Sequence, residues 1–361
     1  MSSYIKELTQ ISNVHDMIMF HKYPAETHFV QTADGYILEL NRITRNGGRP
    51  VLFVHGLQGS AMTWVMMGPS ASLPYMLYNQ GYDIWLANVR GCVFSRQHIK
   101  YDPNLDPIYW QFSWHEIGMY DLPAIIDYVL YKTDAKQLTY FGHSQGGTAF
   151  FVMASILPEY NNKINLMHAL TPAVYLSHMR TSYRIMGEKL FQSTGFPFLG
   201  ELNMPAGRLC LISSVVLSTC LNVIDEMLGP NIENINPEMI PVLFSHFPSG
   251  SGIRQVAHFF QVYKTGVFAP FDEGFWLNNT NHPSPYPLRN VKAPVALYYC
   301  KNDFLIGVED MQRLARELPN VVENYLVPLE KWNHMDPIIG SDAKIILYDK
   351  IIQVQKKLID L

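Results

Sequence analysis

Ser144 stands in a Gly-x-Ser-x-Gly pattern that occurs once in the chain, Gly142-His143-Ser144-Gln145-Gly146. The apolar run Leu138–Phe141 before it predicts a buried strand, and the apolar residues of Thr148–Leu157 after it predict a helix. A serine lifted out of a strand–turn–helix by flanking glycines is typical of a nucleophile elbow. The alternative is an ordinary glycine-rich connection, but the position at the end of a strand favours the elbow.

A serine hydroxyl becomes a useful nucleophile only when a base takes its proton, so a histidine is expected downstream. Among 13 histidines, His334 follows the last predicted strand, Asn324–Val327, where this type of fold carries its base. His168 lies inside a predicted strand and is expected to pack in the core. The remaining rivals fall in the middle section of the chain or before the sheet begins: His246, His282, His15, His21 and His28.

The imidazole needs a carboxylate that orients it and stabilises its charged form. Asp303 comes directly after the predicted strand Val295–Cys300 and gives the chain order Ser, Asp, His. Asp310 lies in a predicted helix and Asp272 in the middle section, so both are expected to act as caps or solvated charges. Asp336 is too close to His334 in the sequence to approach the ring from behind.

The oxyanion that develops during acyl transfer needs two backbone donors. The first is expected from Gln145, the residue after the nucleophile. The second is expected from Leu57, in the loop His55-Gly56-Leu57-Gln58-Gly59 that follows the predicted strand Pro50–Val54.

Buried strand patterns alternate with helical ones, which predicts an α/β fold with a mostly parallel sheet flanked by helices. The rhythm changes from 174 to 289, where apolar helical segments alternate with Pro- and Gly-rich loops. We therefore expect a hydrolase core made of 1–173 and 290–361, with 174–289 inserted as a helical cap. The apolar segment of about 205–228 is either a cap helix packed on the core or a lid over the Ser144 pocket.

Composition excludes several classes of protein. The net charge is −4 and the chain has no run of Lys or Arg, so no nucleic-acid partner is expected. The longest apolar stretch, Leu209–Val223, is interrupted by Ser, Thr and Asn, so no transmembrane segment is expected. No apolar core follows a basic start near Met1, so the sequence as written predicts no signal peptide. No cofactor and no metal are expected.

Short motifs spread over nearly the whole chain resemble the acid lipase family, which includes gastric and lysosomal acid lipases and their insect relatives. They are Tyr23-Pro24-Ala25-Glu26, Thr32-Ala33-Asp34-Gly35-Tyr36-Ile37-Leu38, His55-Gly56-Leu57, Asn88-Val89-Arg90-Gly91, Phe112-Ser113-Trp114-His115-Glu116, Tyr120-Asp121-Leu122-Pro123-Ala124, Gly142-His143-Ser144-Gln145-Gly146, Asn302-Asp303, Leu305, Asp310 and Asn333-His334-Met335-Asp336.

The resemblance implies an α/β-hydrolase that cleaves neutral lipid esters, such as triacylglycerols or cholesteryl esters, at a lipid–water interface under a helical cap with a mobile lid. It assigns Ser144, Asp303 and His334 to the triad and Leu57 and Gln145 to the oxyanion hole. Cys210 and Cys220 resemble the family's cap disulfide. Relatives are secreted or lysosomal, and Asn278-Asn279-Thr280 fits a glycosylation acceptor in such a compartment.

The sequence departs from the family at several positions that do not carry catalytic atoms. They are Leu228 in place of a cysteine, Cys92 and Cys300 in place of Asn or Gly, Phe304-Leu305-Ile306 in place of Trp-Leu-Ala, and Gly147 in place of Thr. Two alternatives to a lipase remain. One is a lipase-fold protein that binds lipid with little turnover, and the other is a carboxylesterase of short-chain esters.

Overall fold

The computed structural model describes residues 2–182, 184, 200–202, 206–276 and 283–359. Its strands follow in this order: β1 (Ala25–Gln31), β2 (Tyr36–Ile43), β3 (Pro50–Val54), β4 (Asp83–Ala87), β5 (Gln97–His98), β6 (Leu138–His143), β7 (Ile164–Leu170), β8 (Glu201–Leu202), β9 (Ser251–Gly252), β10 (Val295–Tyr299) and β11 (Val321–Leu326).

The described α-helices are α1 (Ser3–Gln10), α2 (Val14–Phe20), α3 (Leu73–Asn79), α4 (Trp114–Glu116), α5 (Leu122–Thr133), α6 (Gln145–Ile156), α8 (Ala206–Leu209), α9 (Ser214–Leu228), α10 (Ile240–His246), α11 (Ile253–Thr265), α12 (Glu273–Trp276), α13 (Val308–Glu317), α14 (Asp336–Ile339) and α15 (Asp349–Ile359). The π-helical turns Ile117–Asp121 and Lys344–Tyr348 lead into α5 and α15.

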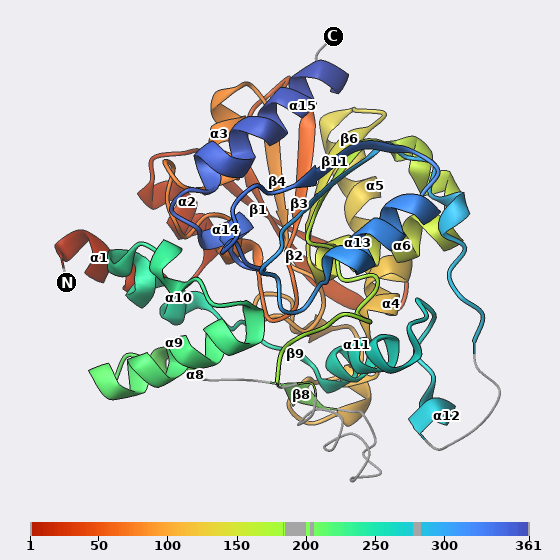
Figure 1. The fold of residues 1–361 in the computed structure, drawn as a ribbon. Helices are drawn as coiled ribbons and strands as arrows, with labels where there is room; N and C mark the ends of the chain where they lie inside the picture. The colour runs from red at the N-terminus through yellow and green to blue at the C-terminus, as the bar shows by residue number, and fades with distance from the viewer. Residues whose placement is uncertain (1, 183, 185–199, 203–205, 277–282, 360–361) are drawn as a thin grey trace.

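One large sheet forms the centre of the molecule, with the strand order β1-β2-β4-β3-β6-β7-β10-β11 and with β5 beside β2 (Figure 1). The pairs from β4 through β3, β6, β7 and β10 to β11 are parallel, while β1, β2 and β5 pair antiparallel. Parallel strands place their carboxyl ends at one edge of a sheet, and the loops that follow them meet there. This α/β architecture confirms the fold class expected from the sequence.

Two apolar layers cover the faces of the sheet, because alternate side chains of a strand point to opposite faces. In β3, Leu52 and Val54 join the layer under α5, α6 and α13. The neighbouring residues Val51 and Phe53 join the layer that holds α1, α2, α3 and α15. Both faces of β3 are therefore covered, which explains its uninterrupted apolar sequence.

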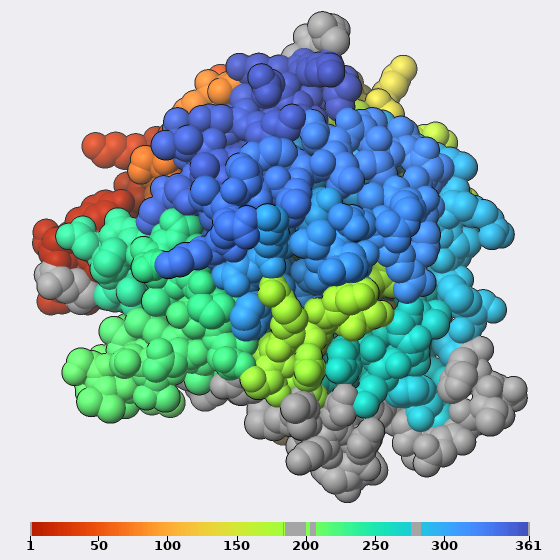
Figure 2. Space-filling model, viewed as in Figure 1, coloured from red at the N-terminus to blue at the C-terminus, as the bar shows by residue number. Residues whose placement is uncertain are grey.

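The section 174–289 enters the chain between β7 and β10, which are neighbours in the sheet. Its described helices α8–α12 lie below the sheet in Figure 1, along the edge where the parallel strands end. In Figure 2 its green and teal residues form the lower part of the molecule, beneath the blue C-terminal residues. The section is thus placed over the loops that carry the predicted site residues.

Most sequence-predicted elements agree with the structure. β3 has the predicted bounds, and β6 and β10 begin at the predicted residues Leu138 and Val295. β11 begins at Val321, three positions before the predicted start at Asn324. The sequence analysis did not foresee α1 and α2, whose buried residues pack under the sheet.

Candidate active site

Ser144 occupies the turn between β6 and α6 with φ 50° and ψ −115°. A non-glycine residue rarely adopts positive φ, and such strain persists only where the surroundings fix it. Here the Ser144 amide donates to Leu170 of the neighbouring strand at 2.9 Å, and the Ser144 carbonyl accepts from Gly147 at 2.9 Å. The sheet on one side and the new helix on the other therefore hold the serine in the elbow that its sequence pattern predicted.

Gly142 and Gly146 permit this turn because the backbone passes too close for any side chain. A Cβ at Gly142 would lie 2.7 Å from the carbonyl carbon of Gly146, and one at Gly146 would lie 2.3 Å from the Val54 carbonyl oxygen. Both distances are below any real Cβ contact. The two glycines are thus required by the packing of the elbow against the end of β3.

The loop after β3 lies against the elbow. The parallel register pairs Val54 with Gly142, and a Cβ at Gly56 would be 3.1 Å from the Ser144 Cβ. Leu57 follows Gly56 in this loop, and Gln145 is the first residue of α6. Within the part of the chain that the structure describes, neither backbone N–H donates to a protein acceptor. Two unused donors therefore lie near the serine, as an oxyanion hole requires.

Asp303 and His334 meet in the loops that follow β10 and β11. His334 Nδ1 lies 2.7 Å from Asp303 Oδ2, and both side chains are buried. The other carboxylate oxygen, Oδ1, accepts from the amides of Leu305 and Ile306 at 2.8 Å each. Because Nδ1–H donates its hydrogen bond to the carboxylate, the lone pair of Nε2 is left free to accept a proton. This pair has the geometry of the acid–base half of a triad.

His143 connects the two halves of the site. It precedes Ser144, and its Nε2 donates to the His334 carbonyl oxygen at 3.0 Å. Burial, together with the nearby His334, lowers the pKa of His143 to about 3, so this ring is neutral. A neutral His143 can hold the His334 loop beside Ser144 without adding a charge.

The rival residues have other roles. His168 is fully buried in β7 between Tyr298 and Gln355, as expected of a core histidine, and burial lowers its pKa to about 4. Asp310 binds the exposed His178 ring at 2.9 Å. Asp336 does not face the His334 ring, and its carboxylate accepts from the Asn333 amide at 2.7 Å.

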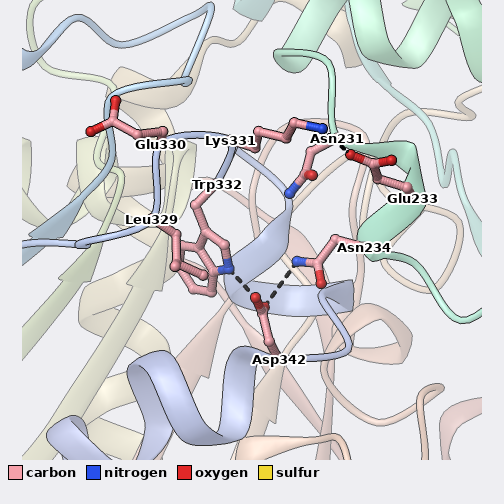
Figure 3. A pocket seen from close by; sticks show the side chains of 8 residues that line it. All are labelled: Asn231, Glu233, Asn234, Leu329, Glu330, Lys331, Trp332 and Asp342. Carbon is pink, nitrogen blue, oxygen red and sulfur yellow. Dashed lines mark hydrogen bonds and ion pairs between the residues drawn. The ribbon is translucent and has the colours of Figure 1, made fainter.

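A hollow of about 360 Å³ lies beside the loop that carries His334 (Figure 3). Figure 3 shows that Trp332 Nε1 and Asn234 Nδ2 both point at Asp342, with bonds of 2.7 and 2.9 Å. Asn231 and Asn234 also donate to Asp336. These hydrogen bonds to Asp342 and Asp336 hold the His334 loop in place.

The C-terminal end of α9 docks on both loops of the acid–base pair. The Leu228 carbonyl accepts from the amides of Phe304 and His334, at 3.3 Å each. A Cβ at Gly229 would lie 1.8 Å from the Asn302 carbonyl oxygen, so only glycine fits there. The inserted section therefore contacts the residues next to Asp303 and His334 directly.

Cys210 and Cys220 form a disulfide that joins the turn after α8 to α9, which confirms the predicted pair. Cys92 and Cys300 are buried free thiols. Pro205, His282 and the glycosylation acceptor Asn278 lie outside the described residues. Among the described residues, no group of His, Cys, Asp or Glu could hold a metal ion, and no helix is both long and apolar enough to cross a bilayer.

Comparison with known proteins agrees with this geometry. Residues 14–68 match the model of the partial α/β-hydrolase lipase region, and residues 49–189 match that of the α/β hydrolase fold. Lipase 1 of Drosophila melanogaster is 40% identical over 98% of this chain and 81% of the fly lipase. The gastric triacylglycerol lipase of Bos taurus is 34% identical over 95% of this chain and 90% of its own length.

The chain belongs to the acid lipase family. This acid lipase is also 33% identical to the lysosomal acid lipase/cholesteryl ester hydrolase of Macaca fascicularis, over 96% of this chain and 91% of that protein. An α/β hydrolase fold protein from Nakamurella multipartita has the same fold, with a TM-score of 0.56 at 14% identity over 91% of this chain and 98% of its own. As a family member, the protein is a carboxylic ester hydrolase.

The sequence analysis overlooked the contacts that hold the acid lipase's site together. His143 was treated only as a variable position of the elbow pattern, and its bond to the His334 loop spans 191 residues. Gln58 is a second such residue, whose φ of 61° is unusual for a glutamine. The signal in the sequence was its position between Leu57 and Gly59, in a loop that must turn sharply directly after a strand.

Proposed function

We propose that this lipase hydrolyses neutral lipid esters, of the triacylglycerol or sterol ester type, through an acyl-enzyme formed on Ser144. The observation that carries the proposal is the buried His334–Asp303 pair at 2.7 Å, on the strand-end loops next to the Ser144 elbow. In this proposal His334 is the general base, Asp303 orients its imidazole, and Leu57 and Gln145 supply the oxyanion hole.

In the proposed reaction Ser144 Oγ attacks the ester carbonyl carbon while its proton passes to His334 Nε2. The carbonyl electron pair moves onto oxygen, and the N–H groups of Leu57 and Gln145 bind this oxyanion. When the intermediate collapses, the carbon–oxygen bond to the alcohol breaks and His334 returns the proton to the alcohol. A water molecule then repeats the sequence on the acyl-enzyme and releases the fatty acid.

An apolar substrate is supported by the surface of the inserted section. Leu209, Ile212 and Val215 are more than half exposed, and α9 has no buried residue within the described chain. Exposed apolar groups of this kind are favoured at a lipid surface, where burial contributes roughly 25 cal/mol per Å². The names of the gastric and lysosomal relatives point to the same substrates, triacylglycerols and cholesteryl esters.

We further propose that 174–289 acts as a cap domain and that the segment of about 205–228 is its lid. The absence of buried side chains along the described α9 favours a lid over a helix packed on the core. A lid of this kind covers the active site in aqueous solution and buries its apolar side chains against lipid at an interface.

The Cys210–Cys220 disulfide and the lysosomal relative support a secreted or lysosomal site of action. No cofactor, nucleic acid or transmembrane anchor enters the proposal.

A hydrolysis panel of esters with increasing acyl length, run on the wild type and on Ser144→Ala in parallel, tests the proposal. A lipase is expected to turn over long-chain esters faster once they exceed their solubility and form an interface, and Ser144→Ala is expected to be inactive on all of them. Turnover confined to short soluble esters would instead identify a carboxylesterase. Binding of lipid without turnover by the wild type would identify a lipid-binding protein.

A further inference from the structure

Gln58, the residue after the proposed oxyanion donor Leu57, is held by the inserted section. Its Nε2 donates to Ser251 Oγ at 2.6 Å and to the Leu202 carbonyl at 2.9 Å. Its own carbonyl accepts from the Ser249 amide at 2.7 Å. The backbone of Gln58 has φ 61°, a conformation that costs a non-glycine residue energy and needs external contacts to persist. Those contacts come from residues far away in the sequence.

Gln145, the other proposed donor, is held by the same part of the inserted section. Gln255 projects from the first turn of α11, is 1% exposed, and donates from Nε2 to Gln145 Oε1 at 3.0 Å. The Gln255 Oε1 accepts from the Gly252 amide at 2.6 Å, which fixes the orientation of its amide. Buried amide–amide bonds that are fully oriented specify one position for each partner.

Gln145 and Gln58, the neighbour of Leu57, are therefore both tied to one short segment, 249–255, and Gln58 also bonds to Leu202. The core alone supplies the strands β3 and β6, but it does not supply these bonds. We propose that segment 249–255 positions the oxyanion hole of this lipase, with Gln58 and Gln255 as its positioning residues. The inference rests on the proposed function, because it presumes that Leu57 and Gln145 bind the oxyanion.

The physical requirement is one of distance. An oxyanion donor acts only when its nitrogen lies about 2.7–3.1 Å from the oxyanion, and removal of one donor lowers kcat by about 10²–10³-fold. Loss of a positioning bond leaves the donor present but displaced, so a smaller loss follows. Since the oxyanion exists only in the transition state, the loss is expected in kcat and not in KM.

The test compares Gln58→Met and Gln255→Met with Gln261→Met. Gln261 is a matched control, because it is also a buried glutamine of α11 with two hydrogen bonds, to the Pro270 carbonyl and from the Asp272 amide. Those bonds stay within the inserted section and do not reach either donor loop. Methionine keeps the length and burial of each side chain and removes only its hydrogen bonds.

With a short soluble ester, Gln58→Met and Gln255→Met are expected to lower kcat about tenfold or more with KM within about twofold. The Ki of an alkyl trifluoromethyl ketone is expected to rise in parallel with the loss of kcat/KM, because its serine adduct places an oxyanion in the hole. Gln261→Met is expected to lose thermal stability to a similar degree and to keep its kcat and Ki.

Equal losses of kcat in Gln255→Met and Gln261→Met, or an unchanged Ki in both test variants, would overturn the inference. If Gln58→Met does not fold, Ser251→Ala provides a milder form of the test, because it removes one acceptor of Gln58 Nε2 and is expected to lower kcat severalfold. Failure of the proposed function would look different, because wild-type enzyme would then resist the ketone and Ser144→Ala would still hydrolyse the ester.

Discussion

Helices α6 and α9 are both rich in apolar residues, yet they differ in how far the folded protein buries them. Eleven of the twelve residues of α6 are buried, from Gln145 to Ser155, whereas the structure buries none of the fifteen in α9. α6 lies in the apolar layer against β6 and carries the first turn of the elbow. α9 lies at the lower left of Figure 1; its C-terminal residue Leu228 accepts from Phe304 and His334, and Cys220 links it to Cys210.

This difference separates two uses of apolar sequence. In α6 the apolar side chains stabilise the fold and fix the position of the proposed nucleophile, so a change there acts on the protein itself. In α9 every apolar side chain stays at least partly exposed, and the exposed part gains free energy only when another apolar phase covers it. The two helices should therefore respond differently to substitution. Three of the five experiments that follow test this expectation, and the other two test the assignment of the acid and the titration of Asp336.

The largest expected effect concerns Ser144, the proposed nucleophile directly before α6. Ser144→Ala is expected to lower kcat by about 10⁶-fold on every ester, because triad members act as one unit. The measurement is steady-state hydrolysis, with circular dichroism to confirm the fold. Ser155→Ala, a buried serine of the same helix that donates to the Val152 carbonyl, is the control and should remain active. Appreciable turnover by folded Ser144→Ala would assign the chemistry elsewhere.

The second effect concerns the choice of acid. Asp303→Asn is expected to lower kcat by about 10⁴-fold, because an amide favours the wrong tautomer of His334. Asp310→Asn is the matched comparison, since Asp310 is equally buried but binds His178. Similar rates for the two variants would contradict the assignment of Asp303.

The third effect is specific to α9. Val215 is 75% exposed, and Val215→Asp is expected to leave thermal stability and short-ester turnover unchanged. On emulsified long-chain ester, its turnover should fall about tenfold, because burial of a valine contributes roughly 1.5–3 kcal/mol and a carboxylate forfeits it. Tyr131→Asp, at an 81% exposed position on the opposite edge of the sheet, controls for added charge. Equal losses on both substrates would make α9 a packing element.

The fourth effect is on stability within the inserted section. Cys210 and Cys220 are 10 residues apart, and closing such a loop contributes about 2–4 kcal/mol in the entropic model. Cys220→Ser is expected to speed hydrogen exchange around α9 while exchange in α6 stays the same. Acceleration in both helices would show that α9 supports the core after all.

The smallest effect concerns pH. Burial, together with nearby Asp342, raises the pKa of Asp336 from the ordinary value near 4 to about 6. The hydrogen bonds from its Asn donors lower this pKa, but by less than burial raises it. The folded state thus holds more protons between pH 4 and 6, and its free energy of unfolding falls as pH rises through that window, by about 1–3 kcal/mol. In urea unfolding, the stability of the wild type relative to Asp336→Asn should be greater at about pH 4 than at about pH 7, by about 1–3 kcal/mol. A constant difference would exclude this contribution.

Sequence reasoning located the parts of the site that depend on local pattern. Ser144, Asp303 and His334 each follow a predicted strand, and parallel topology then brings strand ends together whatever the loops contain. It did not locate Gln58, Gln255 or His143 as contacts, because those bonds join residues 193, 110 and 191 positions apart. The sequence alone does not distinguish a buried glutamine from an exposed one. β11 was placed too late because its residues are only partly buried and alternate in polarity.

The docking of Leu228 and Gly229 on the Asp303 and His334 loops fixes the C-terminal end of α9. The Cys210–Cys220 link ties the other half of α9 to α8, which packs so closely on α10 that a Cβ at Gly207 would lie 2.3 Å from the Phe244 carbonyl oxygen. With 15 residues the helix is a rod of about 22 Å, so a rotation of about 30° about its C-terminal end would move the Ser214 end by about 11 Å. Opening of the proposed lid in this way would therefore separate α8 from α10, while the acid–base pair beside the pivot would keep its 2.7 Å geometry.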